Sequence, residues 1–170
     1  TGAGGAARLE ALVRRRAAIE DLGLTLRVLD AQHVVALESQ TGLLDQVRAS
    51  AADRAGAGAG LTTRPVFSYL VTSMRSGDRE VPYSLVTAID LASIATLPSS
   101  TAAPGAPPPI VINDWTARNL GVAVGSPLTL EFSVWEEPGQ LVTRTADFHV
   151  AAIVPIDGPA DDRNLAPVYP

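Results

Sequence analysis

Residues 2–7, Gly-Ala-Gly-Gly-Ala-Ala, have types and spacing that could bind a dinucleotide, because they fit the pattern G-x-G-x-x-A. Such glycines let a backbone turn approach a pyrophosphate, which rests on the N-terminus of the following helix. A helical pattern and then a strand pattern ending in Asp30 follow, about where such folds place a ribose-binding acid. The fold also needs a strand before the glycines, and only Thr1 precedes them here. We therefore favour a flexible glycine-rich leader over a cofactor loop.

The two histidines, His33 and His149, are candidate metal ligands. A zinc site needs further nitrogen, oxygen or sulfur ligands at suitable spacing, and neither histidine has a local cluster of them. His149 lies in an alternating pattern in which Phe148 and Val150 take the opposite face. We therefore expect His149 to be a surface or hydrogen-bonded strand residue, and we predict no metal site.

Carboxylates gather near the C-terminal end of the sequence, at Asp157, Asp161 and Asp162. Calcium can use such oxygens as ligands. Their spacing differs from the D-x-D-x-D-G pattern of a calcium loop, however. We therefore expect an ordinary solvated loop in which an aspartate pairs locally with Arg163.

Two pairs of adjacent acids, Glu20 with Asp21 and Glu136 with Glu137, could serve as acid–base catalysts. Adjacent residues of a helix or strand point in different directions, so neither pair converges on one substrate. The patterns G-x-S-x-G, H-E-x-x-H and the P-loop do not occur, and the serines have no adjacent base to activate them. The sequence therefore predicts no catalytic or cofactor-binding residue, and no enzyme.

Aromatic residues are sparse, and some of them could anchor a binding surface. Trp115 and Trp135 are candidates, although Trp115, on a short helical pattern, could equally pack beneath that helix. Tyr69 and Tyr83 are further candidates for exposed contacts. We favour Tyr69, Tyr83 and Trp135 for exposed contact, and we assign none of them as a site residue.

Charge and composition narrow the range of partners. The net charge of -5 disfavours a nucleic acid, whose phosphates require a basic patch. The absence of cysteine excludes disulfides and thiolate metal sites, and it is compatible with an oxidising compartment. No apolar run approaches the roughly 18–20 residues that span a bilayer. We expect a soluble piece excised from a longer chain.

Helical patterns are expected at three places. Residues 7–22 are amphipathic, and Gly23 follows them as a stop signal. Residues 43–54 form the second pattern, with Ser39 or Thr41 as the expected cap. Its predicted buried stripe consists of Leu43, Leu44, Val47 and Ala51. The third is a two-turn helix at residues 114–120, with Asn113 as its N-cap and Gly121 as its stop.

Strand patterns alternate with turn signals along most of the chain. They lie at residues 24–29, 33–39, 66–74, 81–89, 110–112, 128–135 and 141–154. The reversals at Gly77-Asp78 and at residues 136–140 predict hairpins, and Pro82 fits an edge strand or a strand start. Residues 55–60 predict a flexible breaker. The sum is an α+β fold, with mixed sheets built largely of hairpins and about three helices.

Residues 92–109, rich in proline, serine and alanine, predict an exposed linker that divides residues 1–91 from residues 110–170. The second part begins with a strand that leads into a pattern N-[DE]-x-x-A-[RK]-x-L-G, followed by x-x-G-[DS]-x-[VL]-x-[LV] and F-x-V-x-G-I-V. The matching residues are Asn113, Asp114, Ala117, Arg118, Leu120, Gly121, Gly125, Leu128, Leu130, Phe148, Val150, Ile153 and Val154. Ala152 departs from the pattern, where glycine is usual.

This succession resembles permease subunits of the FtsX-like/MacB-like ABC transporter family. The segments EDLGLTLRVL, YLVTSMRSGDREVPYSLVTAID and ADDRNLAPVYP are similar to one bacterial branch of such permeases, so the resemblance covers most of residues 18–170. It implies a non-enzymatic extracytoplasmic domain, truncated at both ends from a membrane protein. The expected porter-like α/β part is residues 1–91, and the smaller β-rich part is residues 110–170.

The resemblance also implies partners and a location. The domain would lie on the outer side of the cell membrane, and the permease would work as a dimer with a cytoplasmic ABC ATPase reached through the membrane part. An extracytoplasmic protein, or lipid or peptide cargo, would bind to it, and the parent chain would carry apolar spans of about 20 residues on both sides. The alternative is a free-standing soluble enzyme that binds a dinucleotide or another small ligand. Neither interpretation specifies the cargo.

Overall fold

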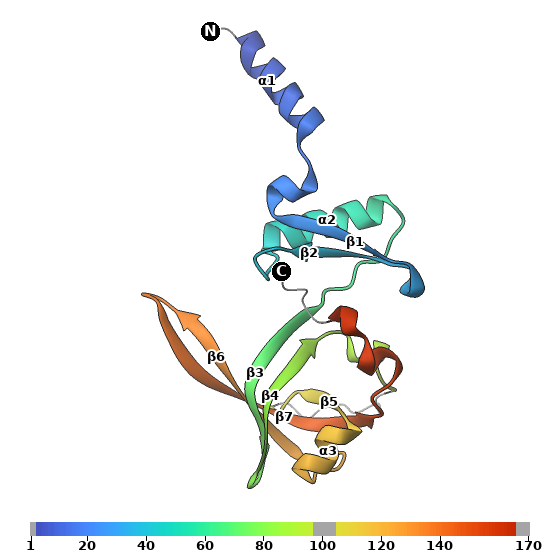
Figure 1. The fold of residues 1–170 in the computed structure, drawn as a ribbon, viewed down its shortest axis with the longest axis vertical. Helices are drawn as coiled ribbons and strands as arrows, with labels where there is room; N and C mark the ends of the chain where they lie inside the picture. The colour runs from blue at the N-terminus through green and yellow to red at the C-terminus, as the bar shows by residue number, and fades with distance from the viewer. Residues whose placement is uncertain (1–2, 97–104, 166–170) are drawn as a thin grey trace. The chain divides into compact units, whose positions relative to one another are not determined.

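The computed structural model describes residues 3–96 and 105–165 of the chain. The chain forms two compact units, Thr1–Thr63 and Arg64–Pro170, which we describe separately. Within the described residues there are three α-helices and seven β-strands, in one sheet of two strands and one of five (Figure 1). The predicted α+β fold is therefore confirmed. No helix in these two ranges is long and apolar enough to cross a membrane.

The N-terminal unit combines a β-hairpin with helices. Its elements are α1 (Ala3–Arg16), β1 (Leu24–Leu29), β2 (Val34–Ser39) and α2 (Gln46–Gly58). β1 and β2 pair antiparallel along their whole length, as the two strand patterns predicted. The predicted helix over residues 7–22 divides in two, because α1 ends at Arg16 and a 3-10 turn covers Ile19–Leu22. Gly23 ends that turn in the left-handed conformation, at φ 69°.

Helix α2 differs from its prediction at both ends. It begins at Gln46, where the Asp45 carboxylate accepts the backbone N–H of Arg48 at 2.8 Å, so the predicted caps Ser39 and Thr41 were wrong. It continues to Gly58, through most of the predicted breaker at residues 55–60. The predicted buried stripe is exposed: Leu43 and Leu44 precede the helix, and Val47 and Ala51 face solvent. The helix starts later than predicted because Asp45 is a good N-cap residue, and Asp45 follows both leucines in the chain.

The C-terminal unit is a five-stranded sheet with one helix on it (Figure 1). Its elements are β3 (Phe67–Ser76), β4 (Arg79–Ala88), β5 (Pro109–Asn113), α3 (Asp114–Leu120), β6 (Pro127–Glu136) and β7 (Gln140–Val154). The strand order is β4-β3-β6-β7-β5, with β5 parallel to β7 and the other pairs antiparallel. β3–β4 and β6–β7 are the predicted hairpins, and Pro82 lies on the edge strand β4 as expected.

The core of this unit lies where α3 packs against the sheet. The buried apolar side chains there are Val71, Met74, Val81, Ile110, Ile112, Ala117, Leu120, Leu128, Leu130 and Val150. The Asn113 side chain accepts the backbone N–H of Thr116 at 2.7 Å, and Gly121 ends α3 in the left-handed conformation. The predicted bounds and both caps of this helix are therefore confirmed.

The division between the units differs from the predicted one. The hairpin of β3 and β4 lies in one sheet with β5, β6 and β7, whereas the sequence assigned it to residues 1–91. A proline-rich connection between two parts of one sheet has the same composition as a linker between domains, so composition cannot separate the two cases. Of the predicted linker at residues 92–109, residues 97–104 lie outside the described residues.

Candidate interaction surface

The glycines of the dinucleotide pattern lie in a helix rather than in a loop. Gly4 and Gly5 fall within α1, which begins at Ala3, while Gly2 lies outside the described residues. A phosphate-binding turn needs glycines that bend the backbone before a helix starts, so Gly4 and Gly5 do not form one. A shallow hollow on α1 is lined by Ala7, Glu10, Ala11 and Arg14. Because one helix supplies all of this lining, the hollow does not enclose a ligand.

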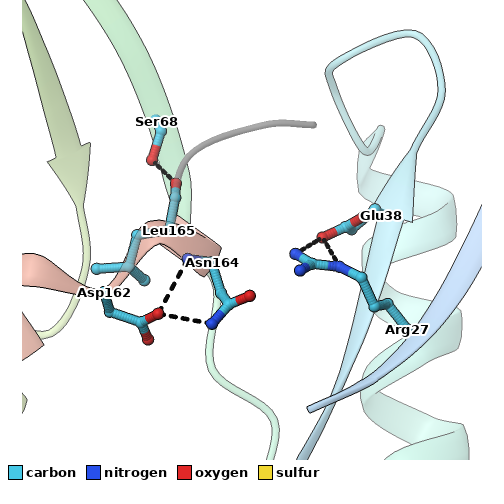
Figure 2. Close-up of polar contacts among 6 residues, drawn as sticks. All are labelled: Arg27, Glu38, Ser68, Asp162, Asn164 and Leu165. Atoms are coloured by element: carbon cyan, nitrogen blue, oxygen red, sulfur yellow. Dashed lines mark hydrogen bonds and ion pairs between the residues drawn. The ribbon is translucent and has the colours of Figure 1, made fainter. Parts of the chain in front are cut away.

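The histidines and the C-terminal aspartates have structural contacts. The Nδ1 atom of His149 lies 2.7 Å from the carbonyl oxygen of Pro107, so the expected hydrogen-bonded histidine is confirmed. His33 ends a 3-10 turn at φ 54°. Asp162 accepts the backbone and side-chain N–H groups of Asn164 at 2.9 and 2.7 Å (Figure 2), so its partner there is an amide rather than the expected Arg163. In the described ranges, no group of three or more potential ligands could hold a metal ion.

The acidic pairs also act as structural groups. The Asp21 carboxylate accepts the backbone N–H of Ala18 at 2.9 Å, and Glu136 forms an ion pair with Arg144. The hydrogen bond from Glu136 raises the pKa of Arg144 above its usual value. The pKa of the Asp45 carboxyl is lowered, mainly by the backbone N–H that it accepts from Arg48. Both perturbed groups are exposed, and a local partner explains each shift, so neither points to proton transfer chemistry.

The hairpin of β6 and β7 carries two of the exposed large apolar side chains of the five-stranded sheet, Trp135 and Leu141. The hairpin of β6 and β7 extends away from β3 and β4 (Figure 1). β3 pairs with β6 only at residues 129–131, and β5 pairs with β7 only from His149 onward. We call the intervening residues 132–148 the arm. Its residues 132–144 form a two-stranded ribbon, whereas residues 145–148 pair with residues 128–131 of β6. Trp135 and Leu141 are cross-strand partners on this arm, and they are 70% and 66% exposed.

The arm is held on its inner side by aromatic contacts. The rings of Tyr69 and Phe132 meet edge to face with centroids 6.3 Å apart, and Phe67 lies 6.1 Å beyond Tyr69. The Tyr69 hydroxyl donates a hydrogen bond to the carbonyl oxygen of Ser133. Three of the chain's eight aromatic side chains therefore gather at the base of the arm, and Trp135 adds a fourth near its tip. A two-stranded ribbon is marginal in water by itself, so these contacts position the arm.

An irregularity in β3 and β4 places Tyr69 there. Val71, Met74 and Val81 all belong to the core, although residues 71 and 74 should face opposite sides of a regular strand. The ladder between β3 and β4 skips Tyr83, which has a left-handed φ of 49°. The side of β3 that faces the core therefore switches from odd-numbered to even-numbered residues at this point. Tyr69 lies on the same side as Val71, where its ring contacts Phe132 of the arm. Strict alternation in the sequence gave no sign of this change.

The aromatic candidates have different outcomes. Trp135 and Tyr83 are exposed, as expected for residues that contact a partner. Tyr69 is partly covered, because it contacts Phe67, Phe132 and the carbonyl group of Ser133. Trp115 is about half exposed on α3, whose inward face carries Ala117 and Leu120. The side chain of Trp115 therefore does not pack fully beneath the helix.

The N-terminal unit has an apolar surface of its own. On one face of its hairpin, Leu26, Val28 and Val35 are about half exposed or more. On the other face, the guanidinium group of Arg27 donates to the Glu38 carboxylate at 3.1 and 2.5 Å (Figure 2). The hairpin thus presents apolar side chains on one side and an ion pair on the other.

A scan against models of known protein families matched none, and a search of curated proteins found no match.

Proposed function

We propose that this chain is a non-enzymatic binding domain, namely the extracytoplasmic domain of an ABC transporter permease of the FtsX-like/MacB-like kind. It would bind substrate or a partner outside the membrane and move with the ATPase cycle of the transporter. Two lines of reasoning support the proposal. One is the motif shared with such permeases, and the other is the exposed arm beside a rigid core.

The observation that carries the proposal is that the motif positions build one stiff unit. Asn113 caps α3, while Ala117 and Leu120 bury its inner face against the sheet. Gly121 has a φ of 66°, and a Cβ there would lie 2.8 Å from a guanidinium nitrogen of Arg79. Glycine therefore allows both the left-handed turn and the close approach of Arg79. A strand–helix–strand unit fixed in this way suits a domain that transmits displacement as a rigid body.

A further argument is the distribution of apolar surface. Trp135 and Leu141 are exposed on the arm, on the face opposite to that of the buried Leu128 and Val150. Tryptophan is enriched at the centres of protein interfaces because it covers a large area and can donate one hydrogen bond. The alternative of a dinucleotide-binding enzyme has less support, because Gly4 and Gly5 lie within α1.

The location can be tested by cysteine labelling, because this chain contains no cysteine. Asp78, in the exposed turn between β3 and β4, is replaced by cysteine (Asp78→Cys) in the full-length protein in its own cells. We expect a membrane-impermeant maleimide to label this variant on intact cells. Ala117→Cys is the matched control, because residue 117 is buried and should react only after denaturation. Labelling of Asp78→Cys only after lysis would overturn the extracytoplasmic location.

A further inference from the structure

Strand β7 is much longer than the strand on its outer side. β7 has 15 residues, and β5 pairs only with its last part, from His149 to Val154. Between residues 140 and 148, no described strand pairs with the outer edge of β7. This stretch of β7 follows directly on from the part that β5 covers.

The hydrogen-bonding direction of this edge follows from three contacts. The backbone N–H of His149 donates to the carbonyl of Pro108 at 3.0 Å, on the outer side. The N–H of Val150 donates to the carbonyl of Ser126 at 2.9 Å, on the side of β6. Ser133, directly opposite Thr143, turns its carbonyl toward Tyr69 and away from β7. Successive residues of a strand alternate in direction, so the odd-numbered ones point outward.

The outward residues of the arm are therefore Leu141, Thr143, Thr145 and Asp147, which we call the β7 edge. All four side chains are exposed. Each residue offers one N–H and one carbonyl group on the outer side, in the repeat of a β-ladder. The edge is thus a template for one further strand.

Natural proteins usually protect such an edge with prolines, lysines, bulges or short strands. Residues 140–148, Gln-Leu-Val-Thr-Arg-Thr-Ala-Asp-Phe, contain neither proline nor lysine, and they are rich in β-prone types. The two charges of this stretch have partners within the β6–β7 hairpin, since Arg144 pairs with Glu136, and Asp147 accepts the Thr129 hydroxyl at 2.7 Å. The β7 edge therefore lacks the usual deterrents against strand addition.

We propose that the β7 edge binds an extended peptide segment of a partner protein, which adds to the sheet as a strand in line with β5. The proposal rests on the binding role proposed above and specifies the kind of partner. A peptide main chain matches all four pairs of outward groups, whereas a lipid or an apolar small molecule offers no such repeat. Side chains of the segment on the face of Leu141 would contact that exposed side chain. Glu137, exposed in the turn between β6 and β7, favours a segment that carries a lysine or arginine there.

The probe is a fluorescein-labelled peptide of alternating valine and threonine with a lysine at each end. A length of about nine residues spans residues 140–148. Fluorescence anisotropy with the whole chain should show saturable binding. Two further peptides carry N-methyl groups on one or the other set of alternate nitrogens. Edge addition uses only one set at a time, and a free strand can present either set, so at least one of the two methylated peptides should keep binding. Loss of binding with both methylated peptides, or no binding of the parent probe, would overturn the proposal.

Two variants of the protein give the matched comparison. Thr143→Pro removes an outward N–H from the β7 edge, and Ser133→Pro removes the N–H of the opposite residue, which points toward β3. Neither N–H takes part in the ladder between β6 and β7, so proline should be tolerated at both positions. We expect Thr143→Pro to weaken the probe at least about tenfold, and Ser133→Pro to change its affinity by less than about twofold. Equal effects would contradict the proposal.

The methylated peptides decide the question in the unmodified protein if either proline variant fails to fold. The peptide-binding experiment tests the β7 edge, and the cysteine labelling tests the location of the domain, so either one can fail without the other. Binding at the β7 edge without surface labelling would leave a strand-binding domain in another compartment. Surface labelling without peptide binding would retain the proposed location and overturn the β7 edge as the partner site.

Discussion

The two ends of strands β6 and β7 differ sharply, although the same strands run through both. At the α3 end, Leu128 is 1% exposed and Val150 is fully buried. On the arm, Trp135 and Leu141 are largely exposed, and Val134 is half-buried. Apolar residues occupy alternate positions of β6 from Leu128 to Val134, so Val134 lies on the same face as Leu128, whereas Trp135 and its partner Leu141 lie on the opposite face. Alternation therefore determines which face of the sheet a side chain occupies, while the elements that cover that face determine how deeply the side chain is buried.

The two ends are also held by different forces. At the α3 end, ten buried apolar side chains form one core. At the base of the arm, a hydroxyl hydrogen bond from Tyr69 and its edge-to-face contact with Phe132 join the two hairpins. Burial of a large apolar side chain contributes about 1.5–3 kcal/mol, more than the roughly 1 kcal/mol net of a hydrogen bond. The arm should therefore be the part of the sheet that opens first.

The largest expected effect comes from removing the same side chain at each end. Leu128→Ala should lower the free energy of unfolding by about 3 kcal/mol, because it leaves a cavity in the core. Leu141→Ala should change it by no more than about 0.5 kcal/mol, because that side chain faces solvent. Urea unfolding followed by tryptophan fluorescence reports on this unit, since Trp115 and Trp135 both lie in it. Equal losses of unfolding free energy in the two variants would contradict the difference in burial between Leu128 and Leu141.

The helix cap at the α3 end should have a smaller effect. Asn113→Ala removes the acceptor for the Thr116 N–H and should cost about 1 kcal/mol in the same urea titration. Asn113→Asp keeps an acceptor oxygen and should recover most of that loss. A loss that Asn113→Asp does not recover would mean that the cap does not act through this hydrogen bond.

The link at the base of the arm should matter still less to stability. Tyr69→Phe keeps the ring contact with Phe132 and removes the hydroxyl bond to Ser133, so it should cost no more than about 1 kcal/mol. The arm should nevertheless become more mobile, which NMR relaxation of the Trp135 indole can measure. An unchanged relaxation profile would indicate that the ring contact alone positions the arm.

The smallest expected effect lies in the N-terminal unit. The pKa of Asp45 is lowered in the folded chain, mainly by its hydrogen bond from the Arg48 backbone. Its contribution to stability is therefore present above the ordinary carboxyl value of 3.8 and is lost as the pH falls below it. Asp45→Asn keeps a cap and should remove this part of the pH dependence, as followed by thermal melting in circular dichroism. If the melting temperatures of the wild type and Asp45→Asn fell by the same amount at acid pH, the ionised Asp45 carboxylate would not contribute to stability in this way.

The sequence predicted the parts of the fold that local signals determine. Asn113 and Gly121 bounded α3 correctly, because capping chemistry acts within one turn. Gly77 with Asp78 marked the hairpin of β3 and β4 for the same reason. Trp135 was also correctly favoured as an exposed residue over Trp115, whose helical pattern allowed it to pack beneath the helix.

The rest depends on contacts between distant segments. The place of β3 and β4 in the larger sheet, and the change of parity near Tyr83, follow from packing that no local pattern records. The β7 edge was also beyond sequence analysis, because it depends on how far β5 extends along β7. A strand pattern indicates that a strand forms, and it does not indicate which edge remains without a partner.

Amide hydrogen exchange along β7, measured residue by residue by NMR, tests whether the outer edge of β7 is open to a further strand. In the isolated chain, the amides of Leu141, Thr143 and Thr145 should exchange freely, while those of Val142 and Arg144 should be protected by their bonds to β6. Addition of the valine–threonine probe should then protect the three odd-numbered amides. Equal protection of odd- and even-numbered amides before the probe is added would contradict an open β7 edge.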